Sequence, residues 1–307
     1  QSHRGPDSDG LWISETSPVG FIHRRLSILD PSPAGHQPFQ LDGISLTYNG
    51  EIYNFLELRS ELETRGVVFN TDCDTEVLLR AYQQWGFGCL EKFNGMWAFA
   101  LWDERQQHLF CSRDRFGVKP FYYTLKDGEF RFASEPKALV NDDPELRRPN
   151  PRAVGRFFTE GLLDDEEETF FENIHPLPAA HYFVISRKGE LKRLRYWSID
   201  AQQSVPDALL QASNRLLGSP SFHELRVNPL NFDAGPHETL FPSDKDVNRD
   251  WYTCVEAFQA LFADSVRLRL RSDVPVGTCL SGGLDSTSII SIASNYITHP
   301  MKSFSSI

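Results

Sequence analysis

A short run of serine and glycine, Ser281 to Ser286, constrains the fold of this chain more than any other feature of its sequence. The run follows an apolar stretch, Val274 to Leu280, and precedes a second one, Ser288 to Ala293, which together predict a buried strand, a glycine turn and a helix start. Glycine lets a backbone approach an anion closely, and the N–H groups of a first helical turn can donate to it. The turn therefore predicts a phosphate site, and a serine–glycine connection without a ligand is the alternative. No lysine follows Gly283, so this is not the G-x-x-x-x-G-K-S/T loop of enzymes that act on the γ-phosphate of a nucleotide.

The composition is that of a globular chain. Its 307 residues are 40% hydrophobic and 24% charged, enough for a core and roughly two domains. The formal net charge of −11 argues against nucleic acid or an anionic membrane as the main partner. No apolar stretch approaches the ~20 residues of a membrane helix and no leader opens the sequence, so we expect a cytoplasmic protein. The five cysteines form no C-x-x-C pair and predict neither a zinc site nor a disulfide framework.

Three regions differ in their residue pattern. Residues 1–197 alternate short aromatic-rich strands with a few amphipathic helices, which is typical of a layered α+β domain. Residues 198–250 are crowded with proline, asparagine, aspartate and serine and predict a linker or an insertion. Residues 251–307 hold an amphipathic helix, one strand, the glycine turn and a further helix. A parallel sheet buried on both faces needs several such units, so we expect this domain to be incomplete.

Local signals predict individual elements within these regions. The dipeptide Asn49-Gly50 predicts a hairpin turn between the strands Ile44–Tyr48 and Glu51–Tyr53. The acidic run Asp164–Glu168 predicts a solvated loop. Periodicity predicts helices over 56–65 and 75–85, weakly over 208–217, and strands over 96–102, 109–112, 121–124 and 301–305.

Seven segments become informative when they are taken in order along the chain. They are His3–Asp7, His23–Asp30, Tyr48–Asn54, Asp74–Glu76, Ser112–Pro120, Phe132–Leu139 and the loop at Ser281. Each is weak alone, but the ordered set resembles the glutamine-hydrolysing asparagine synthetases. The resemblance covers the chain except for the insertion after Trp197.

The resemblance implies both an architecture and an activity. It implies a class II amidotransferase domain of the N-terminal-nucleophile fold (α+β, four-layer αββα) over 1–197, then the truncated start of an α/β parallel-sheet ATP-pyrophosphatase domain over 251–307. Glutamine is hydrolysed in the first domain, and ammonia passes through a tunnel to the second. There ATP activates aspartate as β-aspartyl-AMP, and ammonia displaces AMP to give asparagine. The implied partners are glutamine, aspartate and ATP with Mg²⁺, and a homodimer is an option for the intact protein.

The residues of the glutamine site can also be argued from their chemistry. Arg25 offers a planar fork for the α-carboxylate of glutamine, with a plain surface arginine as the alternative. Asn49 and Gly50 can supply a side-chain amide and a backbone N–H to the oxyanion that forms on the substrate carbonyl. Glu51 and Asp74 are acidic candidates for the α-ammonium group, with solvated turn carboxylates as the alternative. The resemblance implies that four further residues line the pocket: Leu26, Ser27, Ile28 and Leu29.

The second site is the glycine turn. Ser281, Gly282, Gly283 and Ser286 are expected to hold the phosphates of ATP, with Leu280 and Leu284 beside them. Asp285 would approach the pyrophosphate through Mg²⁺, because a bare carboxylate is repelled by a polyanion. Its alternative role is that of a helix N-cap. No metal ligand is assigned directly.

The sequence departs from the family pattern at several points. The family nucleophile is a cysteine at the mature N-terminus, whereas this sequence begins with Gln1, and an amide side chain cannot attack a carbonyl. We therefore expect a missing N-terminal segment and an inactive fragment. Ile22 replaces a usual glycine, and Ala180 replaces another. Three alternatives remain: a paralogue that amidates a different acceptor, a β-lactam-synthetase-like ligase, which the glutamine-site residues argue against, and a non-catalytic glutamine-binding protein.

Overall fold

The structure is a computed structural model of the whole chain, and it describes residues 1–163, 167–199, 245–298 and 300–305. The chain divides into two compact units, Gln1–Ile199 and Asp200–Ile307. The predictions for 208–217, for Asp164 to Glu166 and for most of the 198–250 insertion fall outside the described residues. Each unit is described by itself below.

A six-stranded antiparallel sheet forms the centre of the first unit, in the order β11-β10-β6-β5-β4-β3. Its central strand β5 reads Gly-Met-Trp-Ala-Phe-Ala-Leu-Trp-Asp, and seven of these nine residues are buried. Because successive side chains point to opposite faces, an unbroken apolar run means that both faces are covered. The strands are β3 Phe39–Leu41, β4 Ile44–Ile52, β5 Gly95–Asp103, β6 His108–Arg113, β10 His181–Ser186 and β11 Leu191–Arg195.

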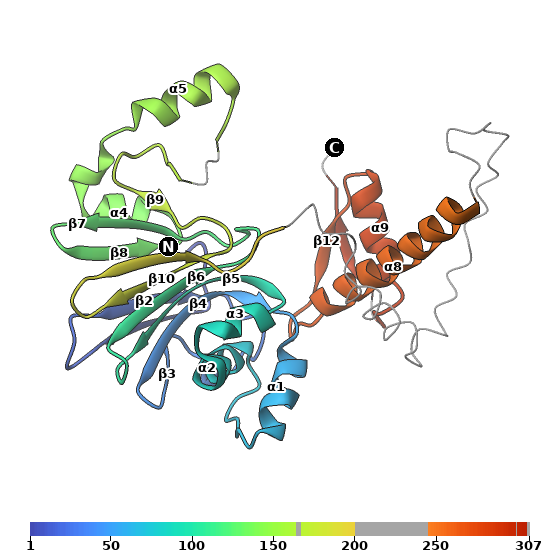
Figure 1. Cartoon of the computed structure of the whole chain (residues 1–307), viewed down its shortest axis with the longest axis horizontal. Coiled ribbons are helices and arrows are strands. Elements are labelled where there is room, and N and C mark those ends of the chain that lie inside the picture. Colours follow the sequence, from blue (N-terminus) through green and yellow to red (C-terminus); the bar gives the residue numbers. More distant parts are fainter. Residues whose placement is uncertain (164–166, 200–244, 299, 306–307) are drawn as a thin grey trace. The chain divides into compact units, whose positions relative to one another are not determined.

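Helices cover one face of the sheet (Figure 1). They are α1 Phe55–Thr64, α2 Asp74–Trp85 and α3 Cys89–Lys92, so the two helices expected from periodicity are confirmed to within one residue. Apolar side chains of α1 and α2, among them Leu62 and Leu78, form one cluster with Trp97, Phe99 and Phe110 of the sheet. This cluster fixes α2 against β4. Asp74 is the first residue of α2.

Shorter strands cover the other face. They are β1 Ser8–Ile13 paired with β2 Gly20–Arg25, and the sheet β8-β7-β9 made of Tyr122–Lys126 (β7), Glu129–Ala133 (β8) and His175–Pro176 (β9). A second cluster joins Phe21 and Phe121 to Ala98 and Ala100 of β5. A third cluster contains Leu139 of α4 (Pro136–Asp142), and Tyr122 of β7 and Ala133 of β8 pack against it. α5 Pro151–Glu160 has no buried residue.

The predicted hairpin at Asn49-Gly50 was wrong. Both residues lie inside β4, which pairs without interruption with β5 from Ile44↔Asp103 to Ile52↔Gly95. A glycine is required at position 50 for a different reason, because a Cβ there would lie 2.2 Å from the carbonyl oxygen of Met96. The residue types that favour a tight turn are here used for a close approach of two strands.

The second unit holds a helix and a strand–loop–helix–strand segment. The helix α8 runs over Lys245–Arg269, and β12 Gly277–Cys279, α9 Leu284–Ala293 and β13 Lys302–Phe304 follow. β12 and β13 are parallel, so the expected second strand is confirmed. The expected buried strand over 274–280 was wrong in length and burial, because only three residues pair and Val276 is 36% exposed. Few described elements pack against β12, which explains the exposure.

Candidate functional site

A cavity of about 930 Å³ lies in the first unit and gathers most of the expected glutamine-site residues. Its walls come from β2, β4, β5, the start of α2 and the segment around Lys119. The lining includes Arg25, Leu26, Ile28, Leu29, Asn49, Gly50, Glu51 and Asp74. Ser27 is not in the lining, and its backbone N–H donates to Asp7 Oδ2 at 2.7 Å. Arg25 and Asp74, which are 49 positions apart in sequence, thus line the same cavity.

Asn49 brings an unsatisfied hydrogen-bond donor to this cavity. Its Nδ2 is buried and has no hydrogen-bond partner in the structure. A buried amide without a partner costs free energy, so such groups are rare in native proteins unless a ligand completes them. The Asn49 side chain is therefore suited to donate to an oxygen atom of a molecule in the cavity.

The backbone of β4 places a second donor beside it. Gly50 is opposite Trp97, whose N–H and C=O both bond toward Asp114, so this pair does not share ladder hydrogen bonds. The Gly50 N–H therefore points away from β5. The amides two residues before and after it, of Tyr48 and Ile52, point the same way and donate to Gln37 Oε1 and Asp74 Oδ2. The Gly50 amide lies between two satisfied ones.

Two carboxylates lie on the cavity wall, and both titrate above their usual range. Burial raises the pKa of Asp74 to about 6, against hydrogen bonds from the Ile52 N–H (2.9 Å) and the Tyr48 hydroxyl (2.8 Å). Burial also raises the pKa of Glu51; the charge of Lys119 opposes this shift and that of Asp74 adds to it. Because both anions are disfavoured where they stand, a cation between them would stabilise both.

The Arg25 guanidinium makes hydrogen bonds within the protein in addition to its expected role in binding a substrate carboxylate. Its side chain is buried; Nη1 donates to the Ser32 carbonyl at 3.0 Å, and Nη2 donates to the carbonyls of Leu29 (3.1 Å) and Asp30 (2.6 Å). These three bonds shape the connection after β2 that contributes Leu26, Ile28 and Leu29. A guanidinium has five N–H donors, so two remain for a carboxylate.

Four further lining residues received no role from the sequence. Tyr48 and Gln37 hold Asp74 and β4, as described above. Burial, then the charges of Arg25 and His36, lowers the pKa of His23 to about 4, and its Nδ1 lies 3.0 Å from Thr47 Oγ1. Lys119, whose pKa burial lowers, lies near Glu51. Lys119 is part of the motif Ser112–Pro120, which could have indicated it, whereas nothing in the sequence indicates Gln37.

The glycine turn of the second unit has the expected strand–turn–helix form. Gly282 has φ +81°, a conformation that glycine adopts readily, and Gly283 is the N-cap of α9. The N-cap alternative for Asp285 was therefore wrong: Asp285 lies in the first turn of the helix. Ser281 Oγ lies 3.1 Å from Ser286 Oγ, and Ser281 and Asp285 are exposed. The turn thus presents hydroxyls and helix N–H groups to solvent.

The residues that the structure describes contain none of three further features: a cysteine in the cavity, a metal-binding cluster or a membrane-spanning helix. None of the cavity-lining residues is a cysteine; Cys73, Cys89 and Cys111 are buried, and Cys254 and Cys279 belong to the second unit. The described part of the chain contains no cluster of three or more histidine, cysteine, aspartate or glutamate side chains arranged for a metal ion. Within the same residues, no helix combines the length and apolar character of a membrane span.

Comparison with protein families identifies the first unit. Residues 1–197 match the model of the glutamine amidotransferase domain, and residues 257–306 match that of asparagine synthase. The chain therefore belongs to the glutamine amidotransferase family. Its glutamine amidotransferase domain is followed by a short asparagine synthase segment.

Curated relatives agree with this assignment. The chain is 34% identical to a putative glutamine-hydrolysing asparagine synthetase 2 of Methanocaldococcus jannaschii, over 94% of this chain and 51% of the relative. It is also 34% identical to asparagine synthetase 3 of Bacillus subtilis, over 96% of this chain and 41% of that protein. Amidase chry2 of Gibberella zeae is 30% identical over 98% of this chain and 38% of its own length. The chain spans about half, or less, of these relatives.

Among solved structures, glutamine phosphoribosylpyrophosphate amidotransferase from B. subtilis, in complex with ADP and GMP, matches 59% of this chain and 35% of its own, with a TM-score of 0.42 and 21% identity.

Proposed function

We propose that the cavity binds L-glutamine and that Asn49 and Gly50 form its oxyanion hole. Arg25 pairs with the α-carboxylate, while Asp74 and Glu51 hold the α-ammonium group. Leu26, Ser27, Ile28 and Leu29 form the segment that encloses the substrate side chain. The Asn49 Nδ2 and the Gly50 N–H donate to the side-chain carbonyl oxygen of glutamine, and most strongly when that oxygen becomes negatively charged.

The observation that carries this proposal is the buried, unpaired amide of Asn49 beside an outward-pointing glycine N–H. Two donors on one strand, facing one cavity, form the arrangement that an acyl-transfer site needs. The opposite charges on the remaining walls match the two ends of an α-amino acid. A cavity for an uncharged or purely anionic ligand would not need two carboxylates in addition to an arginine.

The chemical step requires a nucleophile from outside the lining residues. The resemblance implies a cysteine at the mature N-terminus, whose thiolate attacks the amide carbon. The C–N bond then breaks, ammonia leaves, and water hydrolyses the thioester to glutamate. The described cysteines do not line the cavity, so the polypeptide of residues 1–307 is proposed to bind glutamine without hydrolysing it.

In the whole protein, we propose that this ammonia serves ATP-dependent amidation of aspartate to asparagine in the cytoplasm. ATP supplies the phosphoanhydride that activates the acceptor carboxylate. The glycine turn offers hydrogen-bond donors that suit phosphate oxygens, because exposed hydroxyls and the N–H groups of the first helical turn face solvent there. Its residues Leu280, Ser281, Gly282, Gly283, Leu284 and Ser286 would hold ATP. Asp285 would act through Mg²⁺, and the intact protein is a candidate homodimer.

The finer assignment of the architecture is part of the same proposal. Three apolar clusters support the four-layer αββα arrangement of an N-terminal-nucleophile fold. The first lies between the helices and the large sheet, the second between the large sheet and the shorter strands, and the third between the shorter strands and α4. Domain boundaries at 1–197, 198–250 and 251–307 remain predictions, as does the parallel α/β ATP-pyrophosphatase domain, whose described part has two parallel strands.

Asp74→Asn tests the glutamine site directly. Calorimetry should show that residues 1–307 bind one L-glutamine, and that Asp74→Asn weakens the binding by about ten- to a hundredfold, as expected for a lost charge-assisted contact. Asp142→Asn is the matched control, because the Asp142 side chain is 68% exposed and pairs with Arg131, and neither residue lines the cavity. No binding to the wild-type chain, or equal losses in both variants, would refute the proposal.

A further inference from the structure

Glu76 is a buried carboxylate that the proposed glutamine site does not use. It is the third residue of α2, and its side chain has no exposed surface. The sequence places it in the segment Asp74-Thr75-Glu76 without a role. A charge that is removed from water must be paired with donors, so the groups that it accepts from show what it holds in place.

Its donors belong to the turn that precedes the helix. Glu76 Oε2 accepts the N–H of Thr71 at 2.7 Å, the N–H of Asn70 at 3.0 Å and the Thr71 hydroxyl at 2.9 Å. In a capping box, the glutamate at this helix position bonds only the N–H of the N-cap residue, which here is Cys73. Glu76 instead bonds the N–H groups two and three residues before Cys73 and holds the turn 70–73.

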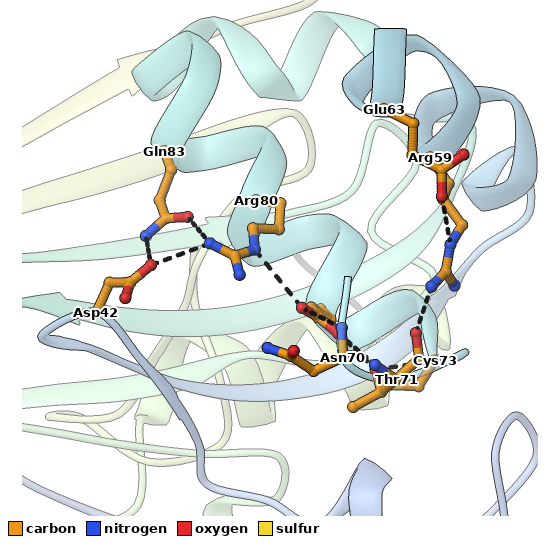
Figure 2. Close-up of polar contacts among 9 residues, drawn as sticks. Asp42, Arg59, Glu63, Asn70, Thr71, Cys73, Arg80 and Gln83 are labelled. Carbon is orange, nitrogen blue, oxygen red and sulfur yellow. Dashed lines mark hydrogen bonds and ion pairs between the residues drawn. The ribbon is translucent and has the colours of Figure 1, made fainter. Parts of the chain in front are cut away.

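The same turn is held from its other side by α1. Arg59 Nη2 donates to the Thr71 carbonyl at 2.6 Å, and the Arg59 guanidinium lies 4.5 Å from the ring centre of Phe69. Figure 2 shows Arg59 and Arg80 on either side of the turn that carries Thr71. Arg80 forms ion pairs both with Glu76 (3.5 Å) and with Asp42 (3.0 Å), so it keeps a partner if Glu76 is replaced.

The turn leads directly into Asp74. The N-cap residue Cys73 makes no side-chain cap hydrogen bond, so the start of α2 is not fixed by its own cap. Asp74 is the first residue of the helix, and its carboxylate reaches β4 at the Ile52 N–H and the Tyr48 hydroxyl. The position of this carboxylate on the cavity wall therefore depends on where the turn 70–73 is held.

We propose that Glu76 is a positioning residue for recognition of the α-ammonium group: it holds the turn 70–73 and thereby places Asp74 at the cavity. The inference rests on the proposed binding of glutamine. Without Glu76, two backbone N–H groups and a hydroxyl lose their common acceptor, and the turn can move away from the body of the domain. An ion contact tolerates little displacement, since binding sites need their groups within about 0.5 Å of the productive geometry.

The test compares L-glutamine with 4-carbamoylbutanoate, which is glutamine without its α-amino group. Wild-type residues 1–307 should prefer glutamine in calorimetry. Glu76→Ala should weaken glutamine binding by about ten- to a hundredfold, the range for losing a hydrogen bond to a charged group, and leave the binding of the analogue unchanged. Glu76→Gln keeps one acceptor oxygen for the turn and should recover most of the preference. Thr71→Val, nearly the same size, removes one of the three bonds to Glu76 together with the contacts of this hydroxyl with the Cys73 N–H (3.4 Å) and Sγ (3.1 Å), and it should give a smaller loss because the two backbone N–H groups keep Glu76 as their acceptor.

A purely structural role predicts a different outcome. Leu62→Ala truncates a fully buried side chain of α1 and should lower the melting temperature without changing the ratio of the two affinities. If Glu76→Ala and Thr71→Val also leave this ratio unchanged, Glu76 does not position Asp74. If Glu76→Ala fails to fold, the ratio measured for Thr71→Val decides. A wild-type chain that binds neither ligand refutes the glutamine site itself, which is a separate result.

Discussion

The buried carboxyl group of Asp74 should make the stability of the first unit fall as pH rises. Burial raises its pKa from 3.8 to about 6, so the folded state binds this proton more tightly than the unfolded state. The resulting contribution to the free energy of unfolding is fully present below pH 3.8 and is lost as pH rises through about 6. This direction is opposite to that of an aspartate in a salt bridge.

The magnitude follows from the shift. The change from 3.8 to about 6 is roughly two pKa units, and at ~1.4 kcal/mol per unit it corresponds to about 3 kcal/mol. Asp74 is 5% exposed, so solvent screening reduces this value little. A change of this size is large beside the ~5–15 kcal/mol that stabilises a typical domain.

Asp74→Asn isolates this effect because asparagine does not titrate. Urea unfolding should be followed for wild type and variant from below pH 3.8 to well above pH 6. Any hydrogen bond lost in the variant contributes a constant difference, whereas titration changes the difference with pH. We expect wild type to lose about 3 kcal/mol relative to the variant over this interval.

The control is Asp72→Asn, which removes a carboxyl from the exposed side of the same turn. The effect assigned to Asp74 is the part of the pH dependence that Asp72→Asn, which removes an exposed carboxyl, does not reproduce. A pH-independent difference for Asp74→Asn, or a wild type that gains stability as pH rises, would mean that Asp74 is not a destabilised buried anion. The cation site argued from its raised pKa would then lose its physical basis.

Three further predictions address the site. In the intact enzyme, Asn49→Ala should lower kcat for glutamine hydrolysis by about 10²–10³ with little change in KM, because the oxyanion exists only during reaction; steady-state kinetics that showed a raised KM and unchanged kcat would contradict this role. Gly35→Ala should weaken glutamine binding in calorimetry, because its Cβ would lie 2.1 Å from Arg25 Nη2, whereas Gly88→Ala, with open space around its Cβ, should not. Purified residues 1–307 should release no ammonia from glutamine, and release that disappears when one of the five cysteines is replaced would reveal a catalytic cysteine outside the cavity lining.

Local sequence was informative where one interaction dominates. Helical periodicity located α1 and α2 because their apolar faces lie against a single sheet face. Asn49-Gly50 misled because turn preferences of two residues compete with nine cross-strand pairs, and the pairs prevailed. Ala180, which stands where the family has glycine, keeps a left-handed φ of +60°. Its N–H and C=O are both hydrogen-bonded, to Asp114 and Tyr196, and these contacts hold the conformation that the side chain disfavours.

The sequence by itself identified the candidate residues of the glutamine site, because Arg25, Asp74 and the pair Asn49 and Glu51 belong to three short segments of the ordered set. Their convergence on one cavity, and the roles of Gln37 and Glu76, were decided by tertiary structure alone. The physical reason is that a hydrogen bond or a buried charge depends on what packing brings beside it. The sequence named Asn49 as a candidate donor but placed it in a hairpin turn, and only the folded chain shows that its amide is buried on a strand without a hydrogen-bond partner.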